Sequence, residues 1–317
     1  MTRIIAQFII LVTLIGTSFG LVAPVTAQVC YTYRTIDIPT PSGLQGFTSL
    51  EAISPVGLIV GQYANQEPPD GYTLKRQRSL LVVKNYRPLR GGPTWPRGIN
   101  RFGDTVGMQR TAPGVFTGYF RRANGVVQTV AVPGAFHTHA LDTNSLRDVV
   151  GSFSVLDPAT GFLGHANGFW RYKGQYLTIN APDGVFGTEL TGINLHQDIV
   201  GWYMDALGVI HGLHIVDGVQ AVINVPGAEN TFVLDLNDAG AMVGMHAPSD
   251  AFGQGFLYQD GVFYPISPGV GEMHSEATGI NNVGEIVGNY LSADGLTHGF
   301  VATPTRGCTT PALAMAE

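Results

Sequence analysis

The chain has 317 residues, of which 44% are hydrophobic, 13% are charged and 42 are glycine. The hydrophobic content excludes a disordered chain, and the abundance of glycine favours many short strands joined by tight turns. The formal net charge of −6 argues against nucleic acid as a partner.

The first 27 residues predict a secretion signal peptide. Arg3 supplies a positive charge, Ile4 to Ile15 is mostly apolar, and Val25-Thr26-Ala27 forms a small-residue cleavage site. An uncleaved anchor helix is the alternative, but a membrane span needs about 20 mostly apolar residues and polar residues interrupt this run. We therefore expect a mature chain from Gln28, secreted to the periplasm or the exterior, monomeric and without stable membrane insertion.

The basic residues are unevenly placed. Eleven of the 17 Lys and Arg residues lie between Lys75 and Arg122, so a ring of repeats would have one basic sector, unless the bias is chance. Lys75, Arg76 and Arg78 form the densest cluster. We expect them to be exposed on a long loop from Ala64 to Arg78, where an acidic polymer would find its first contact.

A Val-Gly pair recurs six times, at intervals of 43 to 50 residues between successive glycines. The pairs are Val60-Gly61, Val106-Gly107, Val150-Gly151, Val200-Gly201, Val243-Gly244 and Val287-Gly288. Such regular repetition indicates a repeat architecture.

Each unit predicts four short strands. In the last unit the first strand ends at Ile280-Asn281, the second covers Glu285 to Tyr290, and the third begins at His298-Gly299-Phe300. In the preceding unit Asp260-Gly261 is a hairpin signal between the third and fourth strands. Four strands in about 40–45 residues are typical of a β-propeller blade.

The turn between the first two strands also repeats. Asn281 and Gly284 occupy the first and fourth positions, where Asn bonds nearby backbone and Gly accepts a positive φ. The other units have Ser54/Gly57, Asn100/Gly103 and Asn237/Gly240, whereas Asn144 and Asn194 lack the glycine. We interpret these residues as scaffold.

The two ends of the chain favour a closed ring over an open β-solenoid. The sixth unit lacks its fourth strand, and the missing strand is found at Tyr33 to Ile38. Ring closure would place that strand beside Gly299 to Thr303 and would remove exposed sheet edges. Cys30 and Cys308, the only cysteines, would then meet and form a disulfide.

The expected architecture is therefore all-β, a six-bladed β-propeller of four-stranded blades closed by the N-terminal strand. It occupies residues 28–308 as one domain after the signal at 1–27, and residues 309–317 form a flexible C-terminal tail.

The units resemble the bacterial extracellular HAF repeat, which reads roughly as Gly-Ile-Asn, then Ile-Val-Gly, then His-Ala-Phe. The resemblance covers Tyr31 to Thr303, with the last tripeptide altered to His298-Gly299-Phe300 and His211-Gly212-Leu213. It implies a secreted or cell-surface protein and implies no activity.

Familiar catalytic motifs are missing from the sequence, including the nucleophile elbow, the zinc-protease helix motif, the phosphate loop and the EF-hand loop. No cofactor or metal is therefore expected. What remains is variation between units at repeated positions. Seven and five residues before the turn residue, some units carry polar groups: His137, His139, Glu189, Asn230, His274 and Glu276.

If the first strand of each blade is innermost, these six residues surround one mouth of the central channel and form a candidate ligand-binding site. The long loop from Ser154 to Ala166 would rim the same face. His137 and His274 belong to opposite blades, which is awkward for one bound metal ion. The alternative is that these side chains only cap strand starts.

Two function classes stay open. One is a binding or structural module for an extracellular ligand, whether a glycan, a protein or a small molecule. The other is a lyase or hydrolase acting on an extracellular polymer at the channel mouth. The fold class does not choose between them, because propellers host many activities.

Overall fold

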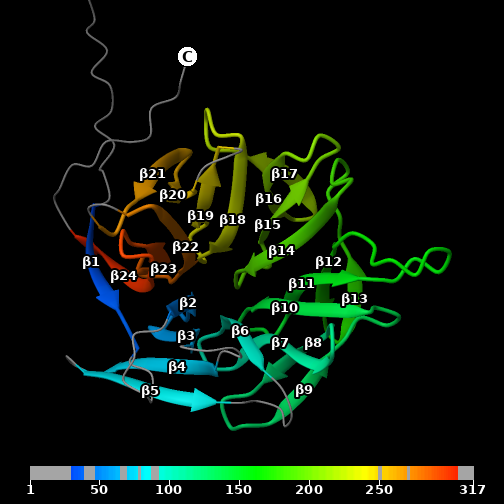
Figure 1. Ribbon diagram of the computed structural model, residues 1–317, viewed down its shortest axis with the longest axis horizontal. Helices are drawn as coiled ribbons and strands as arrows, with labels where there is room; N and C mark the ends of the chain where they lie inside the picture. Colours follow the sequence, from blue (N-terminus) through cyan, green and yellow to red (C-terminus); the bar gives the residue numbers. More distant parts are fainter. Residues whose placement is uncertain are drawn as a thin grey trace, which may run out of the picture.

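The computed structural model describes residues 30–38, 47–64, 70–77, 80–86, 93–248, 252–269 and 272–305. Within them, 24 strands form six four-stranded antiparallel sheets, and Figure 1 shows these sheets arranged around a central axis. The predicted six-bladed β-propeller is confirmed.

The strands follow one another in chain order within each blade. Blade 1 holds β2 (Phe47–Ile53), β3 (Leu58–Ala64), β4 (Asp70–Gln77) and β5 (Leu80–Tyr86). Blade 2 holds β6 (Thr94–Ile99), β7 (Thr105–Ala112), β8 (Val115–Arg121) and β9 (Val127–Val130). Blade 3 holds β10 (His137–Thr143), β11 (Val149–Ser154), β12 (Asn167–Tyr172) and β13 (Gln175–Thr178).

The second half of the ring repeats this order. Blade 4 holds β14 (Gly187–Ile193), β15 (Ile199–Met204), β16 (Ile210–Val216) and β17 (Val219–Ile223). Blade 5 holds β18 (Asn230–Leu236), β19 (Met242–Ala247), β20 (Gln254–Gln259) and β21 (Val262–Ile266). Blade 6 holds β22 (His274–Ile280), β23 (Ile286–Leu291), β24 (Thr297–Thr305) and, from the other end of the chain, β1 (Cys30–Ile36).

The first strand of every blade is innermost, as expected. The strands β2, β6, β10, β14, β18 and β22 contact their neighbours around the axis, and Figure 1 shows them nearest the middle of the ring. Residues on the channel-facing side of these six strands therefore share one space.

The ring is closed by the N-terminal strand. The strand β1 pairs antiparallel with β24, with Ile36 opposite Gly299 and Cys30 opposite Thr305. Tyr33 packs edge-on against Phe300 with ring centroids 6.0 Å apart, so the closing strand also joins the apolar core of blade 6. Cys308 lies outside the described residues, as do the predicted signal peptide and the predicted tail, so the disulfide stays a prediction.

The Val-Gly repeat reflects a close approach between the first two strands of each blade. A methyl group at Gly244 would lie 1.9 Å from the main-chain oxygen of Phe232, and one at Gly151 would lie 1.9 Å from that of His139. An aromatic ring also lies against each of these glycines, Phe256 on the first and Phe169 on the second. Only glycine fits, because any Cβ would overlap backbone atoms.

The inner turns have the expected geometry. Gly103, Gly240 and Gly284 have φ of 79°, 80° and 80°. In the two units that lack the glycine, Arg147 and Gln197 adopt φ of 66° and 68°, so the turn keeps its shape against a conformational preference.

The prediction of a long loop from Ala64 to Arg78 is wrong in its extent, because part of that segment is a strand. Residues 70–77 form β4, which pairs with β3 from Tyr63↔Asp70 to Leu58↔Lys75, so the basic cluster begins within a strand. The side chain of Lys75 is exposed, as predicted. Arg78 lies outside the described residues. The second predicted loop, between β11 and β12, is present at residues 155–166.

Candidate functional site

The central channel opens into a cavity of about 460 Å³ at the end where the innermost strands begin. Sixteen of the described residues line its walls, and each of them occupies one of four repeated positions. Three positions lie on the innermost strand, five, three and two residues before the turn residue. The fourth lies on the second strand, directly after the Val-Gly pair. The lining residues are Ser49, Glu51, Ala52, Gln62, Arg97, Met108, His139, Leu141, Asp142, Glu189, Thr191, Trp202, Leu234, Asp235, Glu276 and Thr278.

Three of the six predicted site residues line this cavity: His139, Glu189 and Glu276. The other three begin innermost strands at the same end of the ring and do not line it. His137 Nδ1 accepts the Phe116 N–H at 3.1 Å, and Asn230 Oδ1 accepts the Ile210 N–H at 3.0 Å. Both bonds satisfy the backbone of the preceding blade, as capping side chains would. His274 makes a ring contact with Phe252 at 6.3 Å.

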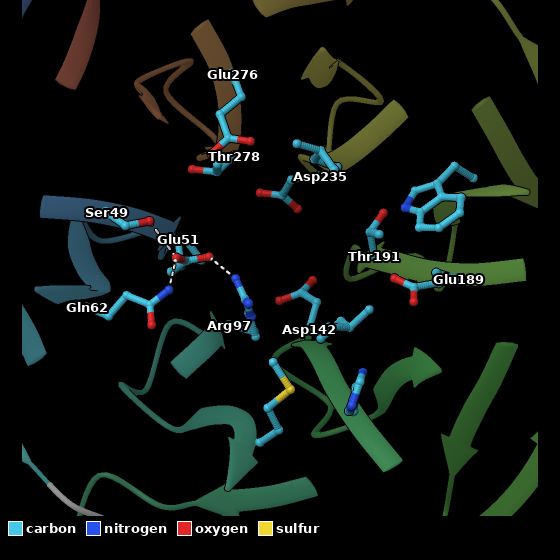
Figure 2. A pocket seen from close by; sticks show the side chains of 16 residues that line it. Ser49, Glu51, Gln62, Arg97, Asp142, Glu189, Thr191, Asp235, Glu276 and Thr278 are labelled. Atoms are coloured by element: carbon cyan, nitrogen blue, oxygen red, sulfur yellow. Dashed lines mark hydrogen bonds and ion pairs between the residues drawn. The ribbon is translucent and has the colours of Figure 1, made fainter. Parts of the chain in front are cut away.

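Glu51 is the centre of a hydrogen-bond network on one wall (Figure 2). Its carboxylate accepts bonds from Ser49 Oγ at 2.6 Å, Gln62 Nε2 at 2.9 Å and Arg97 Nη1 at 2.5 Å. The Glu51 side chain is only 8% exposed, so the pairing with Arg97 is well shielded from solvent. Charge-assisted bonds of this kind hold both side chains in one geometry.

Asn289 connects Glu276 to the neighbouring blade. Its Nδ2 donates to Glu276 Oε1 at 2.9 Å, while its Oδ1 accepts the Leu50 N–H at 2.7 Å. Burial raises the pKa of Glu276, against the lowering effect of the Asn289 bond. Burial likewise raises the pKa of Glu189, whose Oε1 accepts a bond from Ser152 Oγ at 3.3 Å.

Asp142 and Asp235 lie deepest in the cavity. They also line a smaller cavity of about 50 Å³ at the turn end, so the two carboxylates mark a constriction between the two spaces. Figure 2 shows both carboxylates directed toward the middle of the channel. Asp142 Oδ2 accepts the Ile193 N–H at 2.9 Å, and Asp235 Oδ2 accepts the Ile280 N–H at 2.9 Å. Each aspartate thus bridges to the following blade.

The environment of these aspartates disfavours their charged forms. Burial raises the pKa of Asp142 to about 6. Burial and then the nearby charge of Asp142 raise the pKa of Asp235 well above its usual range. Two carboxylates that face one narrow space repel one another, and the protonated form of one relieves that repulsion.

His139 is electrically neutral at physiological pH. Burial lowers the pKa of His139 to about 4, with smaller contributions from His137 and Arg97. Its ring contacts Phe116 at 5.8 Å, edge to face, and its Nε2 has no hydrogen-bond partner among the described residues. His139 therefore offers the cavity an aromatic surface without adding charge.

Sequence reasoning missed Asp142, Asp235, Glu51 and Arg97. Glu51 and Arg97 lie two residues after the predicted channel-facing position, where simple alternation already places them on the channel side. For Asp142 and Asp235 the reason is a bulge in each innermost strand, such as the register shift between Ala140 and Asp142. The bulge breaks the alternation of faces, so residues three and two before the turn residue both reach the channel. A signal existed: two residues before the turn, four units have Ala or Gly and two have Asp.

A channel wall made of carboxylates, a guanidinium, hydroxyls, an amide and one indole can bind a small polar molecule by many hydrogen bonds. Among the described residues, no group of three or more His, Cys, Asp or Glu side chains converges in a way that would hold a metal ion. No helix of the described residues is long and apolar enough to cross a membrane.

The chain matches no known family model, and no curated protein sequence matches it. Several solved β-propeller structures are similar in fold at low identity. TolB from Acinetobacter baumannii is 12% identical with a TM-score of 0.48, over 88% of this chain and 64% of that chain. The β-propeller domain of the Trilobed protease from Pyrococcus furiosus is 11% identical with a TM-score of 0.48, over 84% of this chain and 100% of that chain. AofleA from Arthrobotrys oligospora is 11% identical with a TM-score of 0.47, over 70% and 73% of the two chains. This chain is thus similar to propellers of differing kinds, in fold alone.

Proposed function

We propose that this protein is a secreted binding module that takes a small polar molecule into the mouth of its central channel. One observation carries the proposal: the cavity of about 460 Å³ is walled by repeated positions whose residues differ from blade to blade. The scaffold positions, in contrast, are filled alike in nearly every unit. Variation along the wall of a cavity is what a ligand site requires of a symmetric fold.

Secretion is supported by the signal-peptide pattern of the first 27 residues and by the resemblance to extracellular HAF repeats. Sequencing the N-terminus of the exported protein tests this part. A mature chain that starts at Gln28 is the expected result, and an intact N-terminus on exported protein would contradict cleavage.

A thermal-shift screen of small polar compounds tests the binding function. A ligand at 100 times its Kd stabilises the fold by about 2.7 kcal/mol, which raises the Tm measurably. Met108→Trp would fill part of the cavity and should abolish the shift. Met245→Trp is the matched control, because Met245 occupies the same repeated position in blade 5 and does not line the cavity. Hits that are equally strong in both variants would place binding elsewhere.

A second candidate function is hydrolysis or elimination at the same mouth. The observation that favours it is the pair of buried glutamates, Glu189 and Glu276, whose pKa values are raised by burial as those of general acids are. Turnover of a bound compound that disappears in both Glu189→Gln and Glu276→Gln would establish catalysis. Saturable binding without turnover would leave the protein a binding module.

A further inference from the structure

The cavity carries its carboxyl groups at two depths, and a bound cation would stabilise their charged forms. Glu189 and Glu276 lie five residues before the turn residue and Glu51 lies three before it, nearer the mouth. Asp142 and Asp235 lie two residues before it, at the constriction. Because of the bulge, the positions five and two before the turn residue pair with residues only two apart on the second strand, such as Ser152 and Val150 in blade 3. At about 3.3 Å per strand residue, the two levels of carboxylates are separated by roughly 7 Å along the channel.

The positive charge in the wall is much smaller. Arg97 is the one cationic side chain among the described lining residues, and its Nη1 is already paired with Glu51. His139 adds no charge at neutral pH, because burial lowers its pKa to about 4. The cavity therefore has an excess of carboxylates in a space where water screens them poorly.

An apolar surface lies between the two depths, on the wall opposite Glu51. Leu141 and Leu234 sit one residue before Asp142 and Asp235, and Trp202 lines the cavity on the blade between them. The outer carboxylate Glu189 is directly opposite Trp202 in the strand register. A chain of methylene groups would pack on this surface while polar groups at its ends reach the two levels of charge.

We propose that the cavity binds a linear aliphatic diamine that lies along the channel. One ammonium group contacts Asp142 and Asp235 at the constriction, and the other contacts Glu189 or Glu276 near the mouth. This inference rests on the proposed function, because it names the ligand class of the same cavity. An extended dication fits carboxylates spread over five blades better than a single metal ion does, since an ion needs its ligands at one point.

Calorimetric titration of the purified exported protein with putrescine tests the inference, with n-butylamine and butane-1,4-diol as comparison ligands at neutral pH. Putrescine should bind at least about tenfold more tightly than butylamine, because only the diamine reaches both levels of charge. The diol should bind more weakly still.

Two pairs of isosteric substitutions locate the ammonium groups. Asp142→Asn/Asp235→Asn and Glu189→Gln/Glu276→Gln should each weaken putrescine binding by about tenfold or more. Asn keeps an oxygen to accept the Ile193 and Ile280 N–H groups, so the first variant should fold. Asp217→Asn/Asp260→Asn is the matched control, with the same change of charge at exposed outer hairpins, and should leave binding unchanged.

The outcomes separate this inference from the proposed function. If the diol binds and putrescine does not, and Met108→Trp removes the diol, the cavity is a ligand site and the diamine is wrong. If calcium binds in place of putrescine and the Asp142→Asn/Asp235→Asn variant loses it, the ligand is an inorganic ion. If none of these compounds and no compound of the wider screen binds, the binding function itself falls.

Discussion

Asn144 Nδ2 lies 3.0 Å from the main-chain oxygen of Asn194, which occupies the same turn position in the next blade. The same link joins Asn100 to Asn144 at 3.2 Å, Asn194 to Asn237 at 3.3 Å and Asn237 to Asn281 at 3.2 Å. The turn asparagines therefore connect blades as well as shaping their own turns. Around blades 2 to 6 they form a continuous chain of side-chain bonds.

Substituting Asn144 by Ala should lower the free energy of unfolding by about 2–3 kcal/mol, because the side chain is buried and several groups lose their partners. Its Oδ1 accepts the Leu146 and Asp148 N–H groups in addition to the bond that Nδ2 makes across the blades. Chemical denaturation measures the effect.

Asn124→Ala is the control for that substitution. Asn124 is an exposed turn residue whose Oδ1 accepts the Val126 N–H within its own hairpin. This substitution should lower the free energy of unfolding by no more than about 1 kcal/mol. Equal losses at Asn124 and Asn144 would mean that the link between blades contributes nothing.

Gly244→Ala should destabilise the protein by more than about 3 kcal/mol or prevent folding, since its Cβ would lie 1.9 Å from the Phe232 oxygen. Gly269→Ala is the control, because nothing lies within 4 Å of a Cβ at that exposed position. Its stability should change by less than about 1 kcal/mol. Comparing the two melting temperatures checks this, and a mild effect at Gly244 would require the two inner strands to separate without cost.

The disulfide between Cys30 and Cys308 should stabilise the ring. The strand β1 begins at Cys30 and pairs there with Thr305, so the chain has three further residues in which to reach Cys308. A bond that encloses the chain from residue 30 to residue 308 adds on the order of 5 kcal/mol in the chain-entropy model, and less where the unfolded chain is compact.

Reduction should therefore lower the Tm of the wild-type protein. Cys30→Ser/Cys308→Ser should lower it by the same amount and make it insensitive to reductant. A thiol titration that finds two free cysteines in the exported protein would rule the bond out.

The neutral state of His139 predicts a dependence of stability on acid. Its folded pKa of about 4 lies below the ordinary value of 6.5, so the unfolded chain binds a proton more readily than the fold does. The stability that His139 contributes is thus present above pH 6.5 and is lost as the pH falls toward 4.

His139→Phe keeps an aromatic ring against Phe116 and cannot titrate. The free energy of unfolding of this variant, relative to that of the wild type, should rise by about 1–2 kcal/mol as the pH falls from 6.5 to 4, after allowance for water in the channel. Urea unfolding across that range measures the difference, and a constant difference would mean that His139 titrates normally.

The fold was predictable because its determinants are local and repeated. Each Val-Gly pair marks a close backbone contact, and Asn281 with Gly284 encodes a turn within four residues. The closing strand was predictable because the sixth unit lacked one. The limits of β4 were not, since Asp70 to Gln77 has few apolar residues and reads as a polar loop.

The candidate site was predictable only in part. His139, Glu189 and Glu276 depart from their repeat at a position that faces the channel, and simple counting found them. Asp142 and Asp235 reach the channel only through a bulge, and a bulge depends on the pairing of two strands rather than on the alternation within one. His137 and Asn230 were polar for a different reason, the capping of a neighbouring blade.

The pairing of β1 with β24 also governs the order in which the molecule can assemble. Thr32 must find Thr303, and Cys30 must find Thr305, so these contacts have nearly the greatest sequence separation that the chain allows. Blades 1 to 5 are built from contiguous segments and can each form as soon as their own residues have emerged from the ribosome. Blade 6 is complete only once β24 has been synthesised, and until then β1 has no partner strand. A chain truncated before residue 297 would lose β24, and β1 would then have no strand to pair with. Loss of the last strand would thus also release the first one from the ring.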